Sequence, residues 1–308
     1  MENIWNTGIA TTLLAQSAGK WLEPPMHYAS LLGTEGFYLV FLVLFYWCID
    51  ASAGIRLGLM LMLSDSVNTF FKLLFHHPRP YWYSADVRPY SIENSFGLPS
   101  GHAQHAVSMW GTIAVLYPGR RLRLAAAMVI LLISFSRVYL GVHFYTDVLL
   151  GWVLGLALLF SVARFFTPVT ERLKRLNLSA QIVLAAFISG AVFAIQVIPL
   201  LINSGWVFPE VWMNNINSAV PGAETPDPRR ISGIVSVSGA AFGYGAGLAL
   251  VYRSGGFSAE GTLKQKCARF AAGLVIGVLI YSGLKVILPH GDSPAAEFCR
   301  YIRYAFTG

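Results

Sequence analysis

The sequence predicts an all-α integral membrane protein, a polytopic bundle of about eight transmembrane helices. Of its 308 residues, 55% are hydrophobic and 12% are charged, and the mean hydropathy is +0.57. Soluble domains carry about 25% charged residues. The composition therefore excludes an ordinary soluble enzyme and a disordered chain. Apolar stretches near the roughly 20 residues that cross a bilayer recur along the whole sequence.

Eight apolar stretches are long enough to be considered as spans, and prolines and glycines separate them. We expect spans at residues 33–50, 54–75, 101–118, 122–140, 145–166, 180–202, 231–252 and 268–288. The pattern divides the chain into an N-terminal interfacial segment (1–32), a membrane core (33–166) and additional C-terminal transmembrane helices (167–308).

The N-terminal segment is less apolar than the later stretches. Residues 3–18 mix apolar with small and polar side chains, which favours a short helix in the membrane interface. Trp5 and Trp21 would then lie at headgroup depth. A basic region followed by an apolar run and a small-residue cleavage site is absent from the first 30 residues, so we expect no cleaved signal peptide.

The charge pattern predicts the orientation and excludes one class of partner. Lys and Arg outnumber Asp and Glu by 22 to 15. These basic residues are too sparse along the chain to form a continuous stripe that binds nucleic acid. Alternate loops differ in their content of Lys and Arg, and the richer side should be cytoplasmic. Segments 76–100 and 137–144 then face the periplasm or the exterior, in a chain placed in the inner membrane of a cell. Three cysteines at irregular spacing indicate neither a disulfide framework nor a zinc site.

Ionisable residues gather at the outer ends of several predicted spans. They comprise three cations, two histidines and one carboxylate, and such a cluster at membrane depth indicates a functional site. The residues are Lys72, Arg79, Arg137, His102, His143 and Asp147. Permanent cations at one membrane face are suited to an oxyanion such as phosphate.

The spacing within this cluster indicates how it works. His143 and Asp147 are four residues apart at the start of a predicted helix, so the carboxylate can orient the imidazole. Ser100 is placed to cap the helix that Gly101 and His102 begin, and the first backbone N–H groups of that helix can face an anion. With no aspartate cluster to hold magnesium, we expect neither a metal nor another cofactor, and the cations themselves would stabilise a transferring phosphoryl group.

Three motifs in order carry a resemblance to a known family. Lys72 is followed by six residues and Arg79-Pro80, then come Pro99-Ser100-Gly101-His102, and then Ser136-Arg137 with His143 and Asp147 at fixed spacing. This set resembles the signature of the type 2 phosphatidic acid phosphatase (PAP2) superfamily. Shared aromatic residues after Arg79 make the glucose-6-phosphatase and sphingosine-phosphate phosphatase branches the most similar.

The resemblance implies a helical membrane core and a metal-independent phosphatase that forms a phosphohistidine. His143 would be the nucleophile, Asp147 its orienting partner, and His102 the general acid for the leaving group. The phosphate-binding residues implied are Lys72, Arg79, Ser100, Gly101 and Arg137. The substrate would be a phosphate monoester or diphosphate, and a lipid phosphate is favoured because the cluster lies at headgroup depth.

Other functions stay open at this point. A phosphotransferase would pass the lipid-derived phosphoryl group to an acceptor instead of water. A lipid or anion transporter would only bind through the cations and would have no use for the pairing of His143 with Asp147. Vanadium haloperoxidases share the constellation but are soluble, so the hydrophobicity argues against that activity.

Residues beside the cluster and in the later segments carry further predictions. We expect His76 and His77 to lie in a solvated loop, with contact to the substrate as the alternative. Tyr81, Trp82 and Tyr83 are expected to form an interfacial belt, again with contact to the substrate as the alternative. The long segment 206–230 is either a cover for the site or a connector. Glycines at every fourth position of the seventh span favour close helix packing within the chain, with a homodimer face as the alternative. These glycines are Gly239, Gly243 and Gly247.

Overall fold

The computed structural model describes residues 2–308, and all regular structure in this range is helical. This confirms the predicted all-α class. The first half contains α1 (Glu2–Gln16), a 3-10 turn (Lys20–Leu22), α2 (Glu23–Leu31), α3 (Glu35–Leu44), a π-helical turn (Phe45–Ile49), α4 (Ala51–Phe75), α5 (Pro80–Tyr83), α6 (Gly101–Leu116) and α7 (Arg120–Tyr139). The second half contains α8 (Tyr145–Leu173), α9 (Leu178–Ile202), α10 (Glu210–Ala219), α11 (Ser232–Arg253), α12 (Leu263–Ile287) and α13 (Pro294–Thr307).

Six helices of the described residues are long and apolar enough to cross a membrane. A seventh is added if the bent pair Lys20–Leu31 and Glu35–Ile49, with an angle of 47° between its parts, is one span. The predicted count of about eight is therefore approximate. The predicted span 101–118 corresponds to α6, which has only 16 residues and is largely buried by protein. The predicted interfacial helix corresponds to α1.

The chain divides into two compact units. The first comprises Met1–Phe37, Val67–Leu159 and Pro199–Arg230, and the second comprises Tyr38–Ser66, Phe160–Ile198 and Ile231–Gly308. Every predicted site residue belongs to the first unit. The segment boundaries predicted at residues 32 and 166 divide the sequence in a different way from these units, and they stay predictions.

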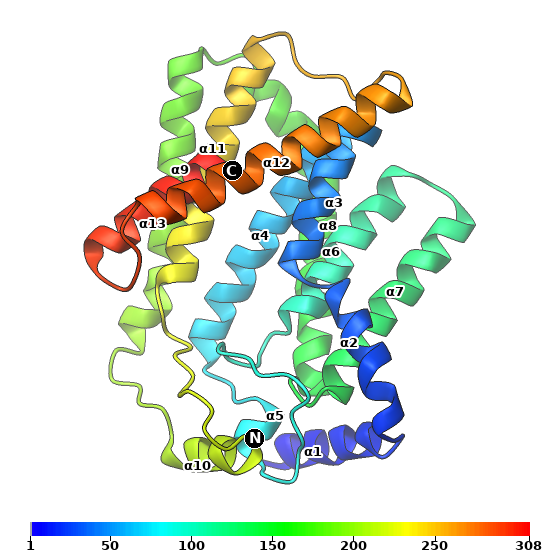
Figure 1. The fold of residues 1–308 in the computed structure, drawn as a ribbon, viewed down its shortest axis with the longest axis vertical. Helices are drawn as coiled ribbons and strands as arrows, with labels where there is room; N and C mark the ends of the chain where they lie inside the picture. Colours follow the sequence, from blue (N-terminus) through cyan, green and yellow to red (C-terminus); the bar gives the residue numbers. More distant parts are fainter. Residues whose placement is uncertain (1) are drawn as a thin grey trace. The chain divides into compact units, whose positions relative to one another are not determined.

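Glycines on α8 bring two helices of the first unit close together. A Cβ atom at Gly151 would lie 2.8 Å from the carbonyl oxygen of Ser100, and one at Gly155 would lie 2.9 Å from the carbonyl oxygen of Gln104. The backbone amide of Ser100 also donates to the carbonyl of Asp147 at 2.9 Å. The starts of α6 and α8 are therefore neighbours. Within the same unit, α6 lies beside α7, and α1 and α10 lie against α5 (Figure 1).

In the second unit, some of the glycines predicted to allow close helix packing within the chain do so. A Cβ atom at Gly239 would lie 2.5 Å from the carbonyl oxygen of Tyr301, and one at Gly243 would overlap the backbone of Ala305. Gly247 has no atom within 4 Å of such a Cβ. Two of the three glycines thus allow α13 to pack on α11. Helix α13 itself was not predicted, although Ser293 caps it by accepting from the amide of Ala296 at 3.2 Å.

We expect Gly243→Ala to destabilise the protein by about 1–3 kcal/mol, because the added methyl group would force α11 and α13 apart. Gly247→Ala is the matched control, since it raises helix propensity equally on the same helix without a clash. The thermal midpoint of the detergent-solubilised protein measures both effects. Equal midpoints for the two variants would contradict the role of Gly243.

Candidate active site

Arg79 lies at the centre of the predicted cluster and is completely buried. Its guanidinium donates to the carbonyl oxygens of Ser95, Val142 and Phe96 at 2.6, 2.9 and 3.3 Å. It also donates to the hydroxyl of Ser95 at 3.0 Å, and it lies 3.3 Å from Nε2 of His143. These contacts fix the guanidinium plane beside the imidazole and engage all five of its N–H groups, so oxygens of a ligand would replace some of the present acceptors.

His143 and Asp147 form the predicted pair at the start of α8. Nδ1 of His143 lies 3.2 Å from Oδ2 of Asp147, and the backbone amide of Phe144 donates to the same oxygen at 3.0 Å. An ionised carboxylate only accepts, so Nδ1 carries the proton. Nε2 is then unprotonated, as its position beside the guanidinium of Arg79 also requires. Burial, and next the charge of Arg79, hold the pKa of His143 well below its usual range. A neutral imidazole therefore has its free lone pair on Nε2.

Arg137 and Lys72 complete the set of cations. Arg137 is 1% exposed, donates to the hydroxyl of Ser30 on α2 and forms an ion pair with Glu93. Its Nε has no hydrogen-bond partner among the described residues. Lys72 donates to the hydroxyl of Ser95 at 2.8 Å. The structure thus connects Lys72 with Arg79, which bonds the same hydroxyl.

The start of α6 supplies backbone and hydroxyl groups. The side chain of Ser100 does not cap the helix as predicted, and its buried hydroxyl has no hydrogen-bond partner among residues 2–308. Gly101 allows close approach, since a Cβ there would lie 3.2 Å from Oδ1 of Asn68. An unpaired buried hydroxyl at a helix start, next to the backbone of Asp147, is suited to a bound anion.

Glu93 belongs to the site and was missed by the sequence analysis. Its carboxylate pairs with Arg137 and lies 3.9 Å from Arg79. Burial would raise the pKa of Glu93, but the charges of Arg79, Arg137 and His102 outweigh it and lower the pKa to about 2. Glu93 is therefore ionised at any working pH and serves as the counter-ion of the guanidinium groups. Glu93 is one of two carboxylates between the motifs of Arg79 and His102, and the sequence alone did not distinguish it from Asp86.

Two expectations for residues near Arg79 were wrong. His76 and His77 do not lie in a solvated loop, since His76 is 8% exposed and His77 lies 3.5 Å from Oδ1 of Asp147. Tyr81 and Trp82 are fully buried and form no interfacial belt. Their short helix α5 is covered on both sides by other parts of the chain, α1 and α10.

Segment 206–230 packs beside these residues. Trp206 stacks on His76 with ring centroids 4.9 Å apart, and Asn215 on α10 donates to the carbonyls of Trp82 and Tyr83 at 3.0 Å each. The segment is therefore attached to α5 and to the residue before His77, next to the loop that carries Arg79.

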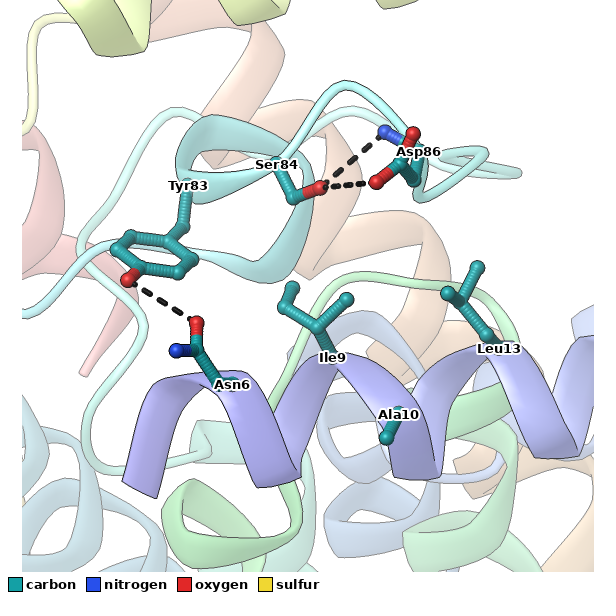
Figure 2. Close-up of a pocket in the computed structure, with 7 residues that line it drawn as sticks. All are labelled: Asn6, Ile9, Ala10, Leu13, Tyr83, Ser84 and Asp86. Atoms are coloured by element: carbon teal, nitrogen blue, oxygen red, sulfur yellow. Dashed lines mark hydrogen bonds between the residues drawn. The ribbon is translucent and has the colours of Figure 1, made fainter. Parts of the chain in front are cut away.

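A surface pocket of about 440 Å³ lies outside the cluster (Figure 2). Its lining residues are Asn6, Ile9, Ala10, Leu13, Tyr83, Ser84 and Asp86. None of them is a predicted site residue, and no group of charges converges there. The pocket marks the contact of α1 with the end of α5 and does not include the buried cluster.

Comparison with known proteins agrees with the predicted resemblance. Residues 53–171 match the model of the PAP2 superfamily, and residues 235–308 match its phosphatase transmembrane extension. Phosphatidylglycerophosphatase B of Bacillus subtilis (strain 168) is 31% identical over 168 residues, 50% of this chain and 78% of that protein. Glucose-6-phosphatase 3 of Bos taurus is 25% identical over 281 residues, 80% and 77% of the two chains. Sphingosine-1-phosphate phosphatase 2 of Mus musculus is 29% identical over 141 residues, 44% and 40%.

We expect Glu93→Gln to destabilise the ligand-free protein by about 1–3 kcal/mol, because two buried guanidinium groups lose their counter-ion. Added orthovanadate should raise the thermal midpoint of this variant more than that of the parent, since the oxyanion replaces the lost charge. Asp86→Asn is the control in the same loop, because Asp86 is exposed and bonds Ser84. A vanadate effect equal in all three proteins would contradict the role of Glu93.

Proposed function

Because the chain belongs to the PAP2 superfamily of membrane phosphatases, we propose that it hydrolyses a lipid phosphate through a phosphohistidine on His143, without a metal. The observation that carries this proposal is the tautomer of His143. Asp147 holds the proton on Nδ1, and Nε2 offers a lone pair beside the guanidinium of Arg79. A site that only binds anions gains nothing from a neutral imidazole held in this way.

In the first step, Nε2 of His143 attacks the phosphorus and the bond to the leaving alkoxide breaks. His102 gives its proton to that alkoxide. Arg79, Arg137 and Lys72 bind the three equatorial oxygens, and Ser100 and the amides that follow it add hydrogen bonds. Nδ1 of His143 gains cationic character as the bond forms, and Asp147 stabilises it.

In the second step, water attacks the phosphohistidine. His102, now without its proton, accepts a proton from the water molecule as the new oxygen–phosphorus bond forms. The bond between phosphorus and Nε2 breaks, the electron pair returns to His143, and inorganic phosphate leaves. The incoming substrate and the departing phosphate both exchange places with Glu93 as partners of the guanidinium groups.

The substrate class rests on the position of the site. The cluster lies at the ends of apolar helices, where a lipid headgroup would meet it while its chains stay in the bilayer. Two of the relatives are named for lipid phosphates and one for glucose 6-phosphate. A phosphate monoester or diphosphate on a lipid is therefore the primary assignment, and a soluble sugar phosphate is the alternative for the same chemistry.

We infer the orientation of the site from the distribution of Lys and Arg, which favours the periplasmic or exterior face of the inner membrane. A lipid phosphate of the outer leaflet would reach the site by lateral diffusion, without crossing the membrane.

Two other functions make different predictions. A phosphotransferase uses the same first step but passes the phosphoryl group to an acceptor alcohol, so labelled lipid phosphate with candidate acceptors separates it from hydrolysis. A transporter needs only the cations, so Asp147→Asn would be nearly silent in transport, whereas our mechanism requires a severe loss of phosphate release.

We expect purified protein to release phosphate in the presence of EDTA, and His143→Ala to lower kcat by about 10³-fold or more, because the nucleophile is lost. The assay compares phosphatidylglycerophosphate, sphingosine 1-phosphate, phosphatidate and glucose 6-phosphate. His290→Ala is the control, since that histidine is exposed and lies in the second unit. Trapping of an acid-labile phosphoenzyme in the parent protein measures the intermediate directly.

Two results would contradict this proposal. Phosphate release that survives His143→Ala would exclude the phosphohistidine on this residue. Release that EDTA abolishes and magnesium restores would exclude the metal-independent mechanism. Release from the soluble substrate alone would leave the mechanism intact and reassign the substrate.

A further inference from the structure

The Oδ1 oxygen of the Asp147 carboxylate has no role in the proposed mechanism. Oδ2 accepts from His143 and from the amide of Phe144. Oδ1 is buried, and no described residue donates a hydrogen bond to it. The polar group that faces it is Nδ1 of His77, 3.5 Å away. A buried carboxylate oxygen without a donor is costly, so this contact needs an explanation.

The protonation of His77 follows from its other neighbour. Trp5 on α1 places its Nε1 2.5 Å from Nε2 of His77. An indole N–H only donates, so Nε2 of His77 is the acceptor and carries no proton. The proton of the neutral ring is then on Nδ1. That nitrogen lies between Oδ1 of Asp147 at 3.5 Å and the carbonyl oxygen of Pro78 at 3.2 Å.

Aromatic contacts hold this arrangement from both sides. The ring of His77 meets Trp5 and Phe144 edge to face, with centroids 5.4 and 5.6 Å apart. Trp5 in turn packs edge to face on Tyr83, whose hydroxyl donates to Asn6 of α1 at 3.3 Å (Figure 2). Helix α1 is therefore attached to the loop that carries His77.

We propose that His77 is a positioning residue for Asp147, with its donor nitrogen selected by Trp5. The Nδ1–H group bonds the carbonyl oxygen of Pro78 and lies 3.5 Å from the outer oxygen of the carboxylate, which its positive end stabilises, while His143 binds the inner oxygen. Trp5, His77, Asp147 and His143 form one chain of contacts from α1 to the nucleophile. Lys72 and Arg79 are the charged groups that act on Asp147 from the other elements. The inference rests on the proposed function, because Asp147 needs orienting only if His143 attacks phosphorus.

Two isosteric replacements of His77 test which nitrogen matters. Asparagine places its amide nitrogen where Nδ1 of histidine lies, and glutamine places it where Nε2 lies. We expect His77→Asn to keep kcat within about threefold of the parent and His77→Gln to lower it about 10- to 100-fold, the effect of losing a partner of a functional ligand. KM should change less than about twofold in both, since His77 does not touch the phosphate.

The N-terminal helix provides an independent variant. Trp5→Phe keeps the aromatic packing but removes the N–H group that selects the tautomer, and it should lower kcat several-fold at unchanged KM. Trp21→Phe is the matched control, because Trp21 is 72% exposed and donates only to the carbonyl of Ala18. In an Asp147→Asn background, neither His77→Gln nor Trp5→Phe should cause a further loss, since both act through Asp147.

The outcomes separate the two proposals. Equal kcat for His77→Asn and His77→Gln, or a rise in KM without a fall in kcat, would overturn the role of His77. Losses that add in the Asp147→Asn background would also overturn it. If a variant at residue 77 fails to fold, Trp5→Phe with and without Asp147→Asn decides the question. Full activity of His143→Ala would instead remove the proposed function itself.

Discussion

The burial of permanent cations is the constraint on which the rest of the first unit depends. Arg79 is completely buried and Arg137 is 1% exposed, and a guanidinium group does not lose its proton to avoid the cost of desolvation. Each must therefore be surrounded by acceptors. Because Arg79 bonds three backbone carbonyls from two loops, these loops have one conformation that satisfies it. The contacts that offset the desolvation cost of the buried guanidinium groups therefore also fix the conformation of the site.

Glu93 shows how the charge is balanced without a ligand. Its carboxylate lies between both guanidinium groups, and its low pKa keeps it ionised. Oxygens of a bound phosphate would meet the same groups and exchange with it. The ligand-free site thus avoids two uncompensated cations, and in the proposed function phosphate binding would replace one set of ion pairs by another. The net gain in binding free energy would then be smaller than the number of cations suggests, which would favour the release of product.

Local spacing was sufficient to predict the helical class, the N-terminal helix and the pairing of His143 with Asp147, because these depend on residues close in sequence. Helix α13 was missed because it is short and polar on one face, so it lacks the length of a span. The burial of Trp82 and the contacts of His77 could not be predicted either. They depend on α1 and α10, which are distant from residues 76–83 in sequence and come to them only through tertiary packing. Ser100 failed as a side-chain cap although its position at the helix start was predicted.

Helix α1 packs against the segment that carries His143. Gly8 has no side chain, and a Cβ atom there would overlap the ring of Phe144, the residue between His143 and α8. Gln16 at the other end of α1 donates to the carbonyl of Tyr139 at 3.1 Å, at the end of α7. The helix thus contacts the chain on both sides of His143, at its middle through Gly8 and at its C-terminal end through Gln16. Because α1 contacts Tyr139 and Phe144, a shift of this helix would act directly on the segment between α7 and α8.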